Sequence, residues 1–215
     1  TTPHTVFLPA HNAQATRLHT PHPAWNDERL YQEARRIVIA ELQHITIDEF
    51  VPAMTGRPLP PYRGYRSNVN PGLSNVFATA AYRVGHSMVG NDIGVINEQF
   101  VEIDSLALQS VFFSPGTIAS VGGIDPFVRY FAADVHQTID AKIVDPLRNF
   151  LFGPPGAGGF DLAALNIQRG RDHGLPDYNT VRHDYGLRAV PTFLHITRNT
   201  ETAARLPSLY RTANN

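Results

Sequence analysis

Apolar residues recur at helical spacing along most of this chain, and this periodicity limits the folds that it can adopt. It is clearest over residues 27–45, where Asn26 is a predicted N-cap and two carboxylates follow at the positive end of the helix dipole. Similar stripes predict helices at residues 5–18, 71–88, 124–133, 139–150, 161–168, 179–185 and 200–206. Strand-like alternation is weak and limited to residues 95–101, which fit a short strand or an extended loop. The pattern predicts a mostly α fold and disfavours a sandwich, barrel or doubly wound sheet.

The 17 prolines and 16 glycines gather at a few places between these helices. The stretch from Gly56 to Pro61 ends the helix that begins at Asp27, which we expect to continue toward Phe50 with a break. Pro71 stands at a first-turn position that proline tolerates. The glycines around Pro154-Pro155 predict a loop over residues 152–159, and residues 106–113 fit a short apolar helix or turn. We therefore expect long structured loops between the helices, within one domain or two small ones.

Composition excludes several classes of function. The 215 residues contain no cysteine, which removes disulfides, thiolate nucleophiles and zinc fingers. The formal net charge of −1 supplies no broad basic surface, so we expect no nucleic-acid partner. No run of 18 apolar residues occurs, so we expect no transmembrane segment.

His86 stands out among the ten histidines because Arg83 lies three residues before it, on the same face of a helix. An imidazole and a guanidinium that project together suit a cofactor with an iron centre and carboxylate arms. The alternative is a partly buried histidine bonded to a backbone carbonyl, beside a solvated arginine. Spacing alone favours that alternative.

Asn166 and Arg169 form a second pair with the same three-residue spacing, on the predicted helix that Asp161 caps. A histidine that binds a metal usually donates its other ring N–H to an acceptor, and an asparagine carboxamide can be that acceptor. The alternative is a loop held by its own ion pairs, with Asp172 bridging Arg169 or Arg171. Read alone, this segment favours the loop.

Other catalytic and metal-binding motifs are absent from the sequence. No serine lies in a Gly-x-Ser-x-Gly elbow, and neither His-Glu-x-x-His nor the spacing of an EF-hand calcium loop occurs. The glycines at 153–159 lack the Lys-Ser or Lys-Thr that follows in a phosphate loop. Hydrolysis by a triad is therefore disfavoured.

Six strings of residues resemble a known family, the animal-type haem peroxidases of the peroxidase–cyclooxygenase superfamily. The strings are Phe7–Asn12, Trp25–Arg35, Tyr62–Tyr65, Asn75–His86, Gly122–Pro126 and Asp161–Pro176. They follow the order found in the family and span essentially the whole chain. The resemblance implies the helical core of a haem peroxidase and reverses both preferences for the structural alternatives.

The resemblance also implies a role for each candidate residue. His86 matches the proximal ligand of the haem b iron, and Asn166 matches the residue that hydrogen-bonds its imidazole. Arg83 and Arg169 match the arginines that hold the haem propionates. The turn from Asp172 to Gly174 matches a segment that we interpret as structural support. By accepting a hydrogen bond from the ring N–H, the asparagine oxygen would give the imidazole some imidazolate character.

Parts of the family pattern have no counterpart in this sequence. These are the distal half with its histidine, glutamine, aspartate and calcium loop, the catalytic arginine with its neighbouring glutamate, and the C-terminal helices. Residues 1–215 are therefore expected to be a partial domain on the proximal side of the haem, to which a second chain would add the distal half. The lack of cysteine, with a single lysine among 18 basic residues, favours a bacterial member.

By resemblance, the expected activity is a haem-dependent peroxidase. It would reduce hydrogen peroxide and oxidise a halide, a pseudohalide or a small aromatic donor, with this chain supplying the proximal ligand. The alternatives are a haem dioxygenase of the same superfamily, for which Tyr82 and Tyr178 are candidate radical sites, and a non-catalytic haem-binding or adhesion module. The resemblance places the protein outside the cell or on its surface.

Overall fold

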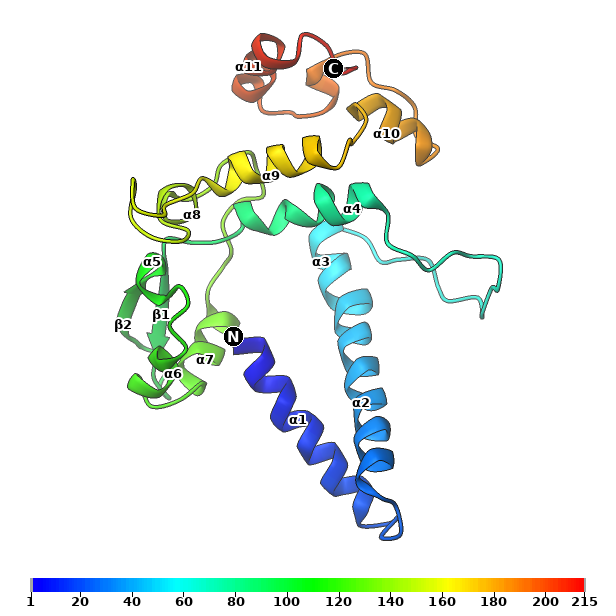
Figure 1. The fold of residues 1–215 in the computed structure, drawn as a ribbon, viewed down its shortest axis with the longest axis vertical. Helices are drawn as coiled ribbons and strands as arrows, with labels where there is room; N and C mark the ends of the chain where they lie inside the picture. The colour runs from blue at the N-terminus through cyan, green and yellow to red at the C-terminus, as the bar shows by residue number, and fades with distance from the viewer. Residues whose placement is uncertain (1, 215) are drawn as a thin grey trace. The chain divides into compact units, whose positions relative to one another are not determined.

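A computed structural model of the protein describes residues 2–214. It divides into two compact units, the first formed by Thr1–Asn70 with Ile118–Val128 and the second by Pro71–Thr117 with Arg129–Asn215. Helices dominate both units, and one two-stranded sheet is present among the described residues (Figure 1). The prediction of a mostly α fold with little strand is confirmed.

Two long helices make up most of the first unit. Helix α1 (Thr2–His19) packs against α2 (Asp27–His44), which buries Ala34 and Val38. The predicted N-cap of α2 is confirmed, because the Asn26 side chain accepts a hydrogen bond of 3.0 Å from the Arg29 N–H. Both helices agree with the periodicity of the sequence, since caps and apolar stripes are encoded locally.

The break predicted toward Phe50 is a change of helix type rather than an end. Helix α2 continues into the π-helical turn η1 (Ile45–Phe50) and then into α3 (Val51–Thr55). Gly56 ends α3 with φ of 74°, a left-handed conformation that glycine adopts without steric cost. The loop predicted from Gly56 onward is therefore confirmed.

The second unit contains most of the shorter elements. They are α4 (Asn75–Thr79), η2 (Ala81–Ser87), β1 (Asp92–Ile96), β2 (Glu102–Ala107), α5 (Leu108–Val111), α8 (Asp145–Asn149), α9 (Leu162–Asp172), α10 (Tyr178–Asp184), η3 (Phe193–His195) and α11 (Thr200–Tyr210). Helices α6 (Gly116–Ser120) and α7 (Asp125–Ala133) lie across the sequence boundaries between the two units. The C-terminal part contains a small apolar core in which Phe193, Ala203 and Ala213 are buried.

Two predicted helices form only in part. The helix predicted at 71–88 begins only at Asn75, because the Ser74 hydroxyl caps the Phe77 N–H at 3.2 Å, and Ala80 then separates α4 from the 3₁₀ helix η2. The helix predicted at 139–150 is reduced to α8, which starts at Asp145 with a proline in its first turn. Residues with apolar spacing precede both starts, but they lie in turns and extended backbone.

The segment 95–101, predicted as a short strand or an extended loop, contains only the last two residues of a strand, and its residues 97–101 connect β1 to β2. Strands β1 and β2 pair antiparallel, with Asp92 opposite Ala107 and Gly94 opposite Ser105. A Cβ on Gly94 would lie 2.8 Å from both the Glu102 carboxylate and the Tyr130 ring, so this close packing requires glycine. Strand β2 was not predicted, because its residues Glu102–Ala107 do not alternate regularly between apolar and polar.

The remaining predictions agree with the structure within a few residues. They concern α7, α9 with its Asp161 cap, α10, α11 and the loop at 152–159. No helix in the described part of the chain is both long and apolar enough to cross a membrane.

Candidate functional site

The structure brings His86 and Asn166 together from two elements of the second unit. His86 lies near the end of η2 and Asn166 in the middle of α9, and α9 packs along α4, the helix just before η2 (Figure 1). The Asn166 carboxamide nitrogen Nδ2 is 2.8 Å from His86 Nδ1, and this contact is partly buried. Two residues that are 80 positions apart in sequence thus form one hydrogen-bonded pair.

Asn166 contacts Nδ1 of the His86 ring, and the protonation of Nδ1 decides whether Nε2 can bind a metal. A half-turn of the carboxamide exchanges its oxygen and nitrogen, so the same position offers either an acceptor or a donor to Nδ1. With the oxygen toward the ring, Nδ1 keeps its proton and donates it, and Nε2 carries a free lone pair. In that tautomer His86 can ligate a metal through Nε2.

The surroundings of His86 keep its ring neutral. Burial lowers the pKa of His86 below its ordinary value of 6.5, and the positive charge of Arg83 lowers it further. Neutral imidazole is the form that binds metals. Protonation therefore does not compete with ligation by His86 near pH 7.

A hollow of 380 Å³ adjoins this pair within the second unit. Three of the four predicted site residues, Arg83, Asn166 and Arg169, contribute to its lining. The rest of the lining is apolar and consists of Leu151, Phe152, Phe160, Leu162 and Leu165. His86 does not line the hollow itself, but its hydrogen-bond partner Asn166 does. The site therefore combines cationic groups with an apolar wall, as a flat apolar ligand with acidic arms requires.

Arg83 has a polar atom that the protein leaves without a partner. Its Nε is buried and makes no hydrogen bond among the described residues. Within residues 2–214, neither Arg83 nor Arg169 forms an ion pair. A buried guanidinium N–H without an acceptor is costly, and a carboxylate bound in the hollow would satisfy it. This unpaired donor shows that the residues present fit a haem with its propionates.

The local geometry of η2 explains why Arg83 and His86 act together. The sequence predicts an α-helix here, but in the 3₁₀ helix that forms, residues three apart lie directly above one another. The two side chains therefore share a face, as predicted, although the helix type differs from the prediction.

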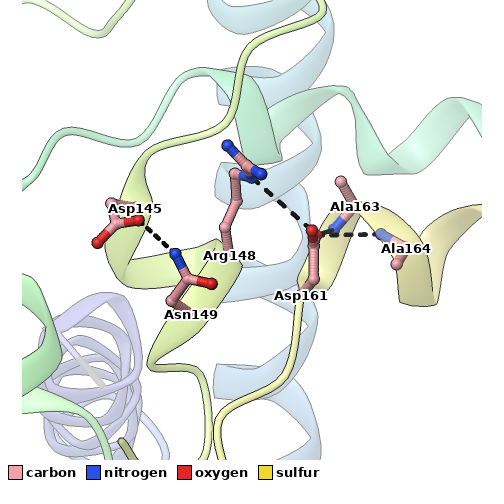
Figure 2. Close-up of polar contacts among 6 residues, drawn as sticks. All are labelled: Asp145, Arg148, Asn149, Asp161, Ala163 and Ala164. Carbon is pink, nitrogen blue, oxygen red and sulfur yellow. Dashed lines mark hydrogen bonds and ion pairs between the residues drawn. The ribbon is translucent and has the colours of Figure 1, made fainter. Parts of the chain in front are cut away.

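Polar contacts at its start position helix α9, which carries Asn166 and Arg169. Figure 2 shows that the Asp161 carboxylate accepts from the N–H groups of Ala163 and Ala164, at 2.8 and 3.1 Å. The same carboxylate lies 3.7 Å from Arg148 Nε on α8, and the two helices pack together. Capping thus fixes where α9 begins, and the ion pair relates it to α8.

The segment after Asn166 is not held by the predicted ion pairs. Asp172 accepts a hydrogen bond of 2.8 Å from Gln168 instead of pairing with Arg169 or Arg171. His173, beside it, contacts Asn75 at the start of α4. Sequence reasoning missed this contact, and also the two phenylalanines of the hollow, because nothing in the local sequence relates residues so far apart.

Among the described residues, no group of three or more histidine and acidic side chains could hold a metal ion. His22, which forms a three-residue spacing with His19 in the sequence, stacks on Trp25 with ring centroids 4.0 Å apart.

This chain is similar in sequence to known proteins over its whole length. The family model of the animal haem peroxidases matches residues 1–215. Peroxinectin A of Dictyostelium discoideum is 40% identical over 208 residues, which cover 97% of this chain and 39% of that protein. Lactoperoxidase of Mesocricetus auratus is 42% identical over 229 residues, which cover 100% of this chain and 32% of that protein.

Solved structures show the same relation. Peroxidase A from Dictyostelium discoideum has a TM-score of 0.90 and 39% identity to this chain, covering 99% of it and 41% of the other chain. The Oryza sativa fatty acid alpha-dioxygenase has a TM-score of 0.75 at 18% identity, over 97% of this chain and 42% of the other, which shows a likeness of fold alone. The chain thus spans about a third to two fifths of the length of these relatives. Since the family model covers it from end to end, this chain belongs to the animal haem peroxidase family.

Proposed function

We propose that this chain forms the proximal side of the haem site in a haem-dependent peroxidase. The observation that carries the proposal is the His86–Asn166 hydrogen bond beside a hollow lined by two arginines without ion-pair partners. Membership of the animal haem peroxidase family supports the same function. The family also favours peroxide as the oxidant.

Each side chain has a separate task in this proposal. His86 Nε2 is the iron ligand, and Asn166 accepts the Nδ1 proton and so fixes the ring's tautomer and orientation. Arg83 and Arg169 bind the propionate carboxylates, and the Arg83 Nε–H gains the acceptor that it lacks in the protein alone. The apolar wall, which includes Phe152 and Phe160, would exclude water from the bound haem. Haem b supplies the redox chemistry once it is bound.

We further propose the reaction class that the sequence predicts. The whole protein would reduce hydrogen peroxide and oxidise a halide, a pseudohalide or a small aromatic donor. Proton transfer to and from peroxide requires an acid–base group on the opposite side of the haem, which a further polypeptide segment or a second chain would supply. Without that group, we expect peroxide turnover to be slower by roughly 10²- to 10⁴-fold.

Several finer expectations stay predictions. They are an extracellular or cell-surface location, a bacterial source, and calcium bound by the family's loop elsewhere. The dioxygenase and the non-catalytic haem-binding module remain the alternative functions, and the fold shared with a fatty acid dioxygenase favours neither reaction.

A titration with haem tests the proposed site. We expect purified protein to bind haem b and to give a Soret band of a histidine-ligated iron, and we expect His86→Ala to abolish or strongly shift that band. His183→Ala is the matched control, since His183 is an exposed histidine on α10. A band that is unchanged in His86→Ala would contradict the assignment of the ligand.

Peroxide-dependent oxidation of iodide and of a phenol then distinguishes the functions. Turnover with hydrogen peroxide supports the peroxidase. Oxygen uptake with a fatty acid would support the dioxygenase, and haem binding without either reaction would support the non-catalytic module.

A further inference from the structure

A second hydrogen-bonded pair joins the two elements of the haem site. Asn75 begins helix α4, and His173 is the C-cap of α9, 98 positions later. Asn75 Oδ1 lies 2.9 Å from His173 Nδ1, and Asn75 Nδ2 donates to the His173 carbonyl oxygen at 3.2 Å. One carboxamide thus contacts both the ring and the backbone of the same residue.

These two bonds define the protonation of the pair. The carboxamide nitrogen faces a carbonyl, which only accepts, so Oδ1 must face the ring. His173 Nδ1 therefore carries the proton and donates it to Asn75. A rotated carboxamide would place its oxygen against the carbonyl oxygen and lose the bond to the backbone. Only one orientation of the Asn75 carboxamide satisfies both hydrogen bonds, and these bonds hold the two side chains in place.

The Asn75–His173 pair and the His86–Asn166 pair join the same two segments, α4 with η2 on one side and α9 on the other, at different places. On α9, Asn166, Arg169 and His173 are three and four residues apart, so they form one stripe along the helix. The start of α4 meets the end of α9, and the end of η2 meets the middle of α9. The segments therefore run antiparallel, with a hydrogen-bonded contact near each end and Arg83 and Arg169 between them in sequence.

Two separated attachments restrain the elements more than one can. With the His86–Asn166 bond alone, η2 can pivot about that bond and change the angle at which the ring presents Nε2. The second attachment removes this pivot. Orientation of a ligating imidazole depends on such supporting contacts, whose loss weakens metal binding about 10- to 100-fold in known sites.

We propose that Asn75 and His173 are positioning residues that hold η2 against α9, so that Asn166 orients His86 toward the haem iron. The inference rests on the proposed function. It adds that the strength of the bond between His86 and the iron depends on a pair of residues that line no part of the hollow.

The test uses the protein reconstituted with haem b and two readouts other than turnover. These are the haem dissociation constant and the frequency of the iron–imidazole stretch in the ferrous state, by resonance Raman spectroscopy. We expect Asn75→Ala and His173→Ala each to weaken haem binding about 10-fold. Both should lower the stretching frequency, in the direction that Asn166→Ala gives, because a misaligned acceptor reduces the imidazolate character of His86.

Two further variants separate positioning from general stability. His173→Asn keeps an N–H donor at the place of Nδ1 and should retain the wild-type frequency, whereas His173→Gln moves that donor and should not. This comparison also serves if either alanine variant fails to fold. Tyr185→Phe removes the neighbouring bond between Ser74 Oγ and the Tyr185 hydroxyl, which joins α4 to the end of α10. It should leave the frequency unchanged.

The outcomes distinguish the two claims. If the wild-type protein binds haem through His86 but the Asn75 and His173 variants leave both readouts unchanged, or if Tyr185→Phe changes them equally, the positioning role is wrong and the haem site stands. If the Soret band survives His86→Ala, the proposed function fails and the positioning role fails with it.

Discussion

Arg83 shows how a single residue reveals the ligand that a site accepts. A buried polar group without a hydrogen bond costs about 1–3 kcal/mol, and more when it is charged. The Arg83 Nε is such a group, and no carboxylate of the described residues pairs with it. An anionic ligand in the hollow would supply the missing acceptor.

We predict that Arg83→Gln weakens haem binding about 10- to 100-fold, since hydrogen bonds to charged groups contribute roughly 1.5–3 kcal/mol. Arg83→Lys should restore little, because an ammonium cannot form the paired bonds of a guanidinium. The measurement is a titration followed at the Soret band. Arg36→Gln serves as control, because Arg36 pairs with Glu33 in the other unit.

The same titration with haem dimethyl ester isolates the propionates. Wild-type protein and Arg83→Gln should bind the ester with nearly equal affinity, because the ester lacks the carboxylates that Arg83 would bind. Equal affinities for unmodified haem would show that Arg83 does not contact a propionate.

Among the helices, local capping decides which segments form where the sequence predicts them. Helices α2, α9 and α10 begin at Asn26, Asp161 and Asp177, and each of these side chains accepts from backbone N–H groups of the first turn. The stop of α9 is also visible in the chain. Gly174 follows α9 with φ of 61°, and the N–H groups of Gly174 and Leu175 bond back to the last turn.

The helices predicted at 71–88 and 139–150 form only in part, and of their two α-helical starts only that of α4 has a side-chain cap. The 71–88 stripe contains apolar residues at helical spacing, yet Ser74 captures the Phe77 N–H and starts α4 four residues after Pro71. Ser74 is held in turn by the Tyr185 hydroxyl, 111 positions away. A contact of that range overrides a weak local propensity, and the sequence cannot display it.

Asp177 makes the stability of the second unit depend on pH. Its hydrogen bond from the Thr180 hydroxyl, of 2.6 Å, is the main reason why the pKa of this carboxyl lies below its ordinary value of 3.8. A lowered pKa in the folded state adds stability that is fully present above 3.8 and disappears as the pH falls through the folded pKa. We therefore predict a loss of stability below about pH 4.

Unfolding at a series of pH values between 2 and 6 measures this effect. Asp177→Asn keeps an oxygen that can accept from the N–H groups of Asn179 and Thr180, so the α10 cap should persist while the acid dependence becomes smaller. Thr180→Ser keeps the hydroxyl and should behave as the wild type does. An acid dependence that is equal in Asp177→Asn and the wild type would assign the effect to other carboxyls.

The division of the whole molecule into two units has a consequence for haem binding. All the residues of the haem site and of its positioning pair belong to the second unit. Binding to the folded state alone stabilises that state by RT ln(1 + [L]/Kd), about 2.7 kcal/mol when free haem is at 100 times Kd. The stabilisation should therefore appear in the unfolding of the second unit.

We predict that haem raises the melting temperature of the second unit by several degrees and leaves the first unit unchanged. Hydrogen exchange during heating, read separately for peptides of α2 and α9, distinguishes the two units. His86→Ala should abolish the increase. An equal increase in both units would mean that they unfold as one cooperative body.

Large apolar side chains remain exposed over both units. Tyr62 and Tyr65 are 85% and 87% exposed, and among the described residues no large side chain is completely buried. The chain also spans only 32–41% of the relatives that it matches.

The sequence by itself determined the helical class and the best-capped helices, and it led to the proposal of four site residues. Spacing and capping act within a few residues, so they can be read along the chain, and the family resemblance chose haem ligation over the structural alternatives. The roles of His86, Asn166, Arg83 and Arg169 remain proposals that the geometry supports.

Only the tertiary structure decided that η2 is a 3₁₀ helix, that Arg83 keeps an unpaired N–H, and that Asn75 joins His173. Each depends on segments separated by tens of residues that come into contact on folding. The free energy of such contacts comes from burial and from hydrogen bonds between distant residues, and no local pattern in the sequence records which partners will meet.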